Sequence, residues 1–251
     1  MTESAKKQWS RREALGLLTV AGAAWSSACG DSPTSPSTVA STSTNTTPTT
    51  TTTTVPPTTA APPTNNASCV VSPTETVGPF PSLNEFVRSD IREGKAGLPL
   101  TLTITVVNTN SACGAVPGAL VDIWQCDASG NYSQYGSDRT LTYLRGLQTT
   151  DSNGRVAFTT IYPGWYQGRA THIHVEVTVN GRSVKVTQIA FPEDVTAQVY
   201  RTGVYASGGQ NPTTNARDMV FSDGVTNEMI TLSGGDATSG FTAAFQVGVA
   251  L

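Results

Sequence analysis

The fold is decided by residues 172–190, HIHVEVTVNGRSVKVTQIA. Apolar and polar side chains alternate in residues 172–179 and again in residues 183–190, which is the period of a β-strand with one buried face. Asn180-Gly181 joins the two runs, and this dipeptide between alternating segments is the strongest short signal for a tight hairpin. The stretch therefore predicts two antiparallel strands.

Similar runs lie on both sides of this hairpin. Residues 100–107 (LTLTITVV) alternate, residues 119–124 (ALVDIW) are rich in strand formers, and no stretch of twelve residues shows a convincing helical period. We predict an all-β domain over residues 68–251, an antiparallel β-sandwich with its active-site loops on one rim. We expect residues 191–251 to complete the sandwich with loops and the strand-like run 241–249, and assign them no chemistry.

Composition excludes several classes of protein. The chain has 251 residues, a formal net charge of −3 and only 13% charged residues. This low charge argues against a coiled coil or a helical bundle, and it leaves no basic surface for a nucleic-acid partner. The chain contains two histidines, His172 and His174, so any histidine chemistry occurs at one place.

The N-terminal segment predicts export. In residues 1–29, Arg11-Arg12 precede an apolar run that is too short to span a bilayer, and the pair resembles a twin-arginine signal. Cys29 fits the lipidated cysteine of a lipoprotein, but the small residues before it fit an ordinary cleavage site equally well. Membrane attachment through Cys29 and free secretion therefore both stay open, and either places the protein outside the cytoplasm.

Residues 30–67 are rich in Thr, Ser and Pro and contain no aromatic residue. Such a segment cannot build a core, so we predict a disordered stalk.

Three cysteines belong to the predicted β-domain. The strand expected at residues 119–125 separates Cys113 from Cys126 by about 23 Å, whereas a disulfide needs Cα atoms within about 7 Å. Cys113 and Cys126 should therefore not pair with each other, and Cys69 can pair with either of them.

The two histidines predict a metal site. Residues i and i+2 of a strand point to the same face, so His172 and His174 project together and form half of a site. Glu176 on the same face would complete a site for Fe(II) or Zn. Tyr132 and Tyr166 would instead supply phenolates, hard anionic donors that favour Fe(III).

Several stretches resemble the intradiol ring-cleavage dioxygenases, the family of the catechol and protocatechuate dioxygenases. They are residues 74–80 (TETVGPF), 118–133 (GALVDIWQCDASGNYS), 150–154 (TDSNG), 161–174 (IYPGWYQGRATHIH) and 187–189 (TQI). The order and spacing of the family are kept, and the stalk and twin-arginine start resemble its secreted bacterial branch.

The resemblance implies a role for each matching residue. One non-haem Fe(III) per chain would be held by four ligands, Tyr132, Tyr166, His172 and His174, with Tyr166 the ligand that leaves when substrate arrives.

Six further residues match the substrate site of the family. Arg169 would stabilise carbanion character on the bound ring, and Gln188 would lie near the oxygen pocket. The ring pocket would be lined by Arg169 together with Thr76, Gly78, Pro79 and Phe80. Phe80 stands where the protocatechuate enzymes have tyrosine, so the ring substituents of the substrate are not predicted.

The implied function is an exported dioxygenase that uses O2 to cleave a catecholic ring between its two hydroxylated carbons, giving a muconate-type diacid. One alternative is a stalked surface β-sandwich for adhesion or glycan binding with an incidental metal site. Another is a Zn or Fe(II) enzyme that uses Glu176.

Overall fold

The computed structural model describes residues 70–251. The predicted export signal (residues 1–29), the predicted stalk (residues 30–67) and Cys69 lie outside this range, and the boundary predicted at residue 68 stays a prediction. The described residues belong to one compact unit, Ala61–Leu251. No helix within the described range is long and apolar enough to cross a membrane.

The predicted hairpin forms one end of a four-stranded sheet, with β7 as the edge strand. Strands β6 (His172–Val179) and β7 (Arg182–Ala190) pair antiparallel, and Asn180 and Gly181 between them have φ of +51° and +73°. Positive φ at both positions is what a type I′ turn requires, which explains the Asn-Gly pair. The sheet continues through β3 (Leu120–Trp124) to β4 (Arg145–Thr149), in the order β4-β3-β6-β7.

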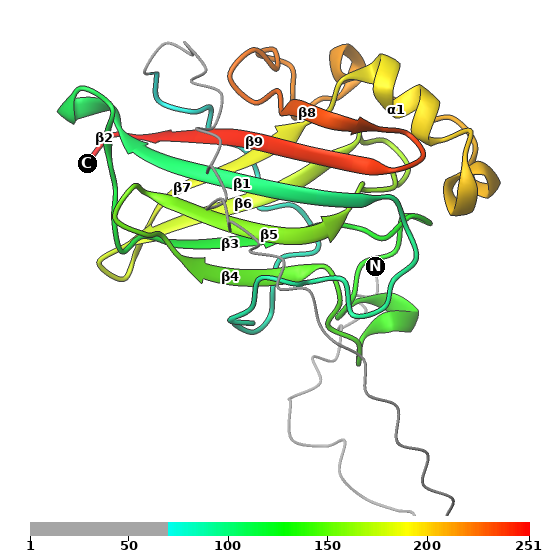
Figure 1. The fold of residues 1–251 in the computed structure, drawn as a ribbon, viewed down its shortest axis with the longest axis horizontal. Coiled ribbons are helices and arrows are strands. Elements are labelled where there is room, and N and C mark those ends of the chain that lie inside the picture. Colours follow the sequence, from blue (N-terminus) through cyan, green and yellow to red (C-terminus); the bar gives the residue numbers. More distant parts are fainter. Residues whose placement is uncertain (1–69) are drawn as a thin grey trace, which may run out of the picture. The chain divides into compact units, whose positions relative to one another are not determined.

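A second sheet packs against the first, which gives the predicted all-β sandwich (Figure 1). Its strands are β1 (Pro99–Asn108), β2 (Gly114–Ala115), β5 (Arg155–Ile161), β8 (Thr231–Asp236) and β9 (Gly240–Val249). Strand β1 is central, with β5 and β2 along one edge and β9 along the other, and β8 pairs with β9.

One pair of strands departs from the prediction of a purely antiparallel sandwich. Strands β1 and β9 run parallel, with Leu100 opposite Phe241 and Asn108 opposite Val249. Side chains alternate in the same way in parallel and antiparallel strands, so the sequence pattern carries no information on direction.

The core lies between the two sheets. Alternate residues of β1 (Leu100, Leu102, Ile104 and Val106) are fully buried there, whereas its threonines face outward or are partly covered. Ile173, between the two histidines of β6, is also fully buried in this core. The histidine side chains therefore project from the opposite face of the sheet.

The predicted strand-like run 241–249 is β9, but residues 191–230, which the sequence predicted as loops, also contain short helical elements. They form the helix α1 (Glu193–Val199) and short 3-10 turns at Gly203–Gly208 and Asn215–Arg217; further such turns occur at Thr109–Ser111 and Gly136–Asp138. Helix α1 has seven residues, which is shorter than a window in which a helical period can be recognised.

The cysteines agree with the prediction that two of them do not pair. Cys113 is disulfide-bonded, and Cys126 is a buried free thiol. The partner of Cys113 lies outside the described residues.

Candidate metal centre

His172 and His174 point their Nε2 atoms at one place. These two atoms lie 3.1 Å apart at the start of β6. The Nδ1–H of His172 donates to the carbonyl oxygen of Ala170 at 2.6 Å, which fixes the tautomer and leaves the Nε2 lone pair free. The pair is therefore oriented as two ligands of one metal ion would be.

Both imidazoles are buried and neutral. Burial, helped by the nearby Arg169 cation, lowers the pKa of His172 to about 3. Burial, and then the neighbouring His172, lower the pKa of His174 well below its usual value. Trp124, opposite His174 on β3, stacks on the His174 ring with centroids 4.8 Å apart and planes 4° apart. A neutral, immobilised imidazole is the form that binds a metal.

Tyr132 and Tyr166 close a circuit of four rings with the two histidines. Ring centroids are 5.6 Å apart for Tyr132 and Tyr166, 5.7 Å for Tyr166 and His172, 4.7 Å for His172 and His174, and 6.3 Å for His174 and Tyr132. The structure thus brings together all four residues that the resemblance implied as ligands.

Two glycines let the tyrosine loops touch. Gly130 has a φ of +85°, and a Cβ on it would lie 2.3 Å from the carbonyl oxygen of Trp165. A Cβ on Gly164 would lie 2.3 Å from the carbonyl oxygen of Asp127. Backbone thus packs on backbone where a side chain has no room. This contact places the loop after β3 beside the loop after β5.

The tyrosine hydroxyls are suited to a metal ion. The Tyr132 hydroxyl is buried and has no hydrogen-bond partner among the described residues, and burial raises its pKa well above 10. Tyr166 is half-buried, and burial raises its pKa as well. A buried hydroxyl without a partner is costly, and a bound cation would both satisfy the oxygen and favour the phenolate. Two imidazoles and two phenol oxygens therefore fit a hard, highly charged ion.

Arg169 is fixed beside this circuit by a carboxylate. Its Nε lies 3.0 and 2.9 Å from the two carboxylate oxygens of Asp218. Its Nη1 lies 3.4 Å from the Tyr166 hydroxyl and 3.5 Å from His172 Nε2, and its Nη2 donates to Gln188 Oε1. The Nη1 group of Arg169 therefore faces the candidate metal centre, and its Nη2 group faces Gln188.

Asp218 is a residue that the sequence analysis missed. Its side chain is fully buried, and it accepts further hydrogen bonds from the backbone N–H groups of Ala170 (2.6 Å) and Val220 (2.9 Å). A single aspartate in a loop 49 positions from Arg169 carries no sequence signal of this pairing.

Residues 74–80 run across the same site. Gln188 Nε2 donates to the Thr76 carbonyl oxygen at 2.9 Å. Gly78 has a φ of +73°, and a Cβ on it would lie 2.9 Å from Cε1 of His174, so the backbone lies against that ring. Phe80 stacks on Tyr132 with centroids 4.7 Å apart, and Pro79 beside it is exposed. Of the residues predicted to line the ring pocket, Gly78 and Phe80 thus lie against the four rings, whereas Thr76 contacts Gln188.

Arg145 was also missed by the sequence analysis. It is fully buried and donates to the Ser133 carbonyl oxygen (2.6 Å), the Ser133 hydroxyl (3.0 Å) and the Phe80 carbonyl oxygen (3.1 Å). It therefore ties the Tyr132 loop to residues 74–80. Its charge also opposes the rise in the pKa of Tyr132.

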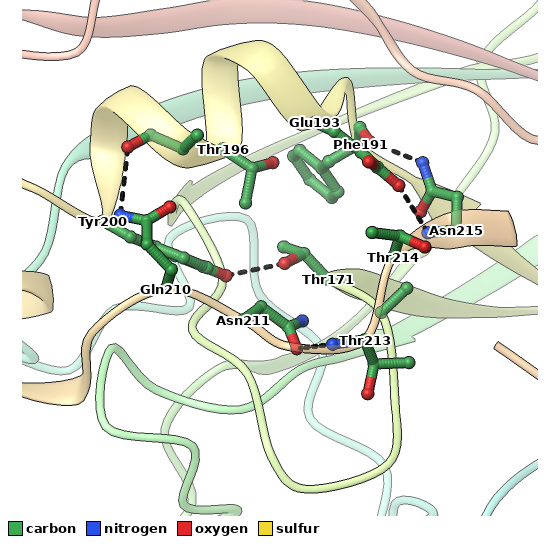
Figure 2. A pocket seen from close by; sticks show the side chains of 12 residues that line it. Thr171, Phe191, Glu193, Thr196, Tyr200, Gln210, Asn211, Thr213, Thr214 and Asn215 are labelled. Atoms are coloured by element: carbon green, nitrogen blue, oxygen red, sulfur yellow. Dashed lines mark hydrogen bonds between the residues drawn. The ribbon is translucent and has the colours of Figure 1, made fainter. Parts of the chain in front are cut away.

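Tyr200, at the end of α1, supports the loop after β5, which carries Tyr166, at two points. Its hydroxyl donates to the Pro163 carbonyl oxygen at 3.0 Å and hydrogen-bonds the Thr171 hydroxyl at 2.7 Å. Thr171 and Tyr200 both line a cavity of about 140 Å³. Figure 2 shows the Tyr200 hydroxyl bonded to Thr171, with α1 on one side of the cavity and residues 210–215 on the other. Residues 191–251, to which we assigned no chemistry, thus contribute Tyr200 and Asp218, which support the segment between β5 and β6.

Glu176 does not join the two histidines. It is half-buried opposite Asp122 on β3 and lines a separate cavity with Asp122 and Glu85. Within residues 70–251, the one group of three or more His, Cys, Asp or Glu side chains close enough to share an ion contains neither histidine. The alternative Zn or Fe(II) site completed by Glu176 is not supported.

Comparisons with known proteins were made by sequence and by structure. A protein-family model described as "Dioxygenase" matches residues 78–207. A curated hydroxyquinol 1,2-dioxygenase from Nocardioides simplex is 34% identical over 40% of this chain, and the match covers 39% of that protein. The chain therefore matches well under half the length of this curated relative.

Solved structures match more completely. An intradiol ring-cleavage dioxygenase from Tetranychus urticae superimposes with a TM-score of 0.65 and 29% identity, covering 72% of this chain and 95% of that chain. The dioxygenase domain of a dioxygenase carbohydrate-binding protein fusion from Streptomyces sp. SirexAA-E has a TM-score of 0.57 and 27% identity, covering 72% and 99%.

Proposed function

Because this chain belongs to the intradiol ring-cleavage dioxygenases, we propose that it is an exported enzyme that uses ferric iron and O2 to open the ring of catecholic compounds. The observation that carries the proposal is the closed circuit of Tyr132, Tyr166, His172 and His174, with both Nε2 atoms converging and a buried tyrosine hydroxyl left without a partner. These four side chains would hold one Fe(III) per chain.

Ferric iron bound to phenolates would bind both oxygens of a catechol and activate the ring toward O2. The product would be a muconate-type diacid, with the ring opened between the two hydroxylated carbons.

The two tyrosines differ in a way that suits them to different roles. Tyr132 is buried and has no hydrogen-bond partner, whereas Tyr166 is half-buried with the Arg169 guanidinium 3.4 Å from its hydroxyl. Of the two tyrosines that would hold the metal, Tyr166 would therefore be the one free to be released when substrate binds, with Arg169 beside its hydroxyl. Since burial raises the pKa of Tyr166, its released phenolate would take a proton from a substrate hydroxyl.

Arg169 and Gln188 would act on the bound ring. The Nη1 group of Arg169 faces the metal centre and would stabilise negative charge that develops on the ring as it reacts. Gln188 is fully buried between the Thr76 carbonyl and Arg169, so its amide is held in one orientation beside the site. Residues 74–80 would exclude water from one side of the ring, with Phe80 as an apolar wall.

Export is part of the proposal. It rests on the twin-arginine-like start of residues 1–29 and the stalk composition of residues 30–67. The disulfide at Cys113 supports it, because disulfides persist in oxidising compartments. Anchoring through Cys29 and free secretion are separated by mass spectrometry of the mature N-terminus.

A visible absorption spectrum of the purified protein tests the metal centre and the substrate class together. We expect near-stoichiometric iron and a red colour from tyrosinate-to-iron charge transfer. Anaerobic addition of catechol, protocatechuate or hydroxyquinol should shift the band for each compound that binds, and O2 uptake should follow on admission of air. A colourless iron-loaded protein would refute the ligand set, and a stalked binding module would take up no O2.

A further inference from the structure

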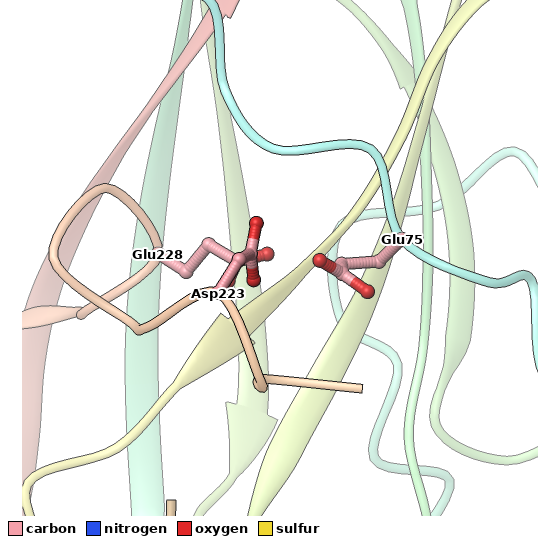
Figure 3. Close-up of side chains that lie close together, drawn as sticks. All are labelled: Glu75, Asp223 and Glu228. Carbon is pink, nitrogen blue, oxygen red and sulfur yellow. The ribbon is translucent and has the colours of Figure 1, made fainter. Parts of the chain in front are cut away.

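Three carboxylates lie together at a place apart from the four rings. One oxygen of each of Glu75, Asp223 and Glu228 lies within 4.8 Å of the others. Figure 3 shows Glu75 pointing across to Asp223 and Glu228, which come from a different segment of the chain. Such spacing would leave room for one small cation between the three groups.

Glu228 supplies the observation that points to a ligand. The residue is fully buried, and its Oε1 accepts a hydrogen bond from the Thr187 hydroxyl at 3.1 Å. Its Oε2 is buried and has no hydrogen-bond partner within the described residues. A buried carboxylate oxygen is stable only with a cation or a proton.

The nearby cationic side chains bind other groups and do not neutralise the three carboxylates. In residues 70–251, none of the three carboxylates forms a salt bridge. Lys185 interacts with Glu228 at a distance, yet its Nζ donates to the Ser72 carbonyl and to the Thr74 hydroxyl, both at 2.7 Å. Arg169, which acts on Glu75 from a distance, is paired with Asp218.

The three carboxylates lie where two segments cover the free edge of β7. β7 is the last strand of its sheet. The N–H of Glu75 donates to the Val186 carbonyl, and the N–H of Ala190 donates to the Glu228 carbonyl. Residues 74–80 thus cover one part of the edge and residues 218–230 another, with Gln188 between them. Both segments also reach the candidate iron site, through Thr76 and Asp218.

We propose that Glu75, Asp223 and Glu228 bind one calcium ion, separate from the iron site, which joins residues 74–80 to residues 218–230 across the edge of β7. Calcium fits because all three ligands are carboxylates, the hard oxygen donors that it prefers, and because Asp223 is exposed, which leaves room for water to complete six to eight ligands. Magnesium demands a stricter octahedral geometry.

The protonation of Glu228 adds a signature of this binding. Burial, and then the Glu75 carboxylate, raise the pKa of Glu228 to about 8. Burial, and then Asp223, raise the pKa of Glu75. Lys185 and Asp223 are the other charged side chains that interact with Glu228. The ion must displace the proton of Glu228, so the affinity for calcium rises as the pH increases toward 8.

Calorimetric titration and thermal unfolding of the iron-loaded full chain test the proposal, with CaCl2 added after dialysis against EGTA. We expect one calcium per chain and a Tm that rises by about 5 °C at a hundredfold excess over Kd. Asp223→Asn should weaken binding at least tenfold while leaving the Tm in EGTA unchanged, because Asp223 is exposed. Glu228→Gln should abolish binding.

Glu85→Gln is the matched control, since Glu85 is exposed and lines another cavity; it should bind calcium as the wild type does. Absence of a calcium-dependent Tm shift in the wild type would overturn the proposal. Unchanged affinity in Asp223→Asn, or equal affinity for MgCl2, would do so too. The iron band in the visible spectrum should be the same with and without calcium, which separates this outcome from any result at the iron site.

Discussion

Asp218 decides where the guanidinium of Arg169 can point. Both carboxylate oxygens of Asp218 accept from Nε of Arg169. The Nη1 group is therefore left to face the candidate metal centre, and the Nη2 group to donate to Gln188. Since Asp218 is held in turn by two backbone N–H groups, the guanidinium has a rigid support. Asp218 is therefore a positioning residue for the proposed reaction.

We predict that Asp218→Asn lowers kcat by about 10- to 100-fold, because a buried charge-assisted pair is worth about 1.5–3 kcal/mol. Iron content and the charge-transfer band should be kept, and KM should change less than kcat. Steady-state kinetics and the anaerobic catechol spectrum provide the measurement. Asp194→Asn, on the exposed start of α1, is the control. A wild-type kcat in Asp218→Asn would show that Arg169 needs no such support.

At the scale of single residues, the sequence predicted the part of the site that lies on one strand. His172 and His174 share a face by the period of β6 alone. By residue type alone, Tyr132 and Tyr166 were one of two alternative completions of the site; only the family resemblance selected them, because they come from different loops. Asp218 and Arg145 could not be found, since each pairs with residues far away in the chain and no local pattern marks them.

At the scale of elements, α1 supports the loop after β5, which carries Tyr166. Tyr200 joins the end of α1 to both ends of this loop, through the Pro163 carbonyl just after β5 and the Thr171 hydroxyl just before β6. The position of this loop therefore depends on a helix that contributes no ligand.

We predict that Tyr200→Phe lowers the Tm by about 3–8 °C and shifts or weakens the iron charge-transfer band. The loss of one hydroxyl leaves a buried carbonyl and a threonine hydroxyl without this partner, which costs about 1–3 kcal/mol. Differential scanning calorimetry and visible spectroscopy measure the two effects.

Tyr205→Phe is the matched control for this variant. The Tyr205 hydroxyl is equally buried and bonded, to the Tyr162 carbonyl and the Leu98 N–H, but it touches neither histidine nor tyrosine ligand. It should lower the Tm and leave the band in place. If both variants altered the band equally, Tyr200 would have no special link to the metal loops.

The elements themselves were predictable where a local signal existed. Asn180-Gly181 predicted the β6–β7 hairpin, alternation located β1, and runs of strand-forming residues located β3 and β9. The parallel pairing of β1 with β9 was not predictable, because it is set by how the chain returns after β8 and not by any local pattern.

At the scale of the whole domain, two carboxyl groups make stability depend on pH. Burial raises the pKa of Asp122 to about 7 and that of Glu228 to about 8, both far above the unfolded values. The folded state therefore holds more protons than the unfolded state, so stability falls as the pH rises through this range. The buried histidines act in the opposite sense only below about pH 6.5, where the unfolded imidazoles are charged.

We predict that the free energy of unfolding in calcium-free buffer falls by about 1–2 kcal/mol between pH 6.5 and pH 8. Denaturant titrations at each pH measure it. The double variant Asp122→Asn, Glu228→Gln should be nearly flat over the same range. A slope in the double variant equal to that of the wild type would show that other groups cause it.

The parallel pairing of β1 with β9 has a consequence for how the chain folds. Leu100 meets Phe241 only after nearly the whole domain has been synthesised, and contacts between such distant residues slow folding. Until β9 has paired with β1, the backbone groups along one edge of β1 are unpaired. Such an edge can pair with a strand of another chain, which is a common start of aggregation. The nascent domain is thus most vulnerable just before completion, and a chaperone that shields β1 would act in that interval.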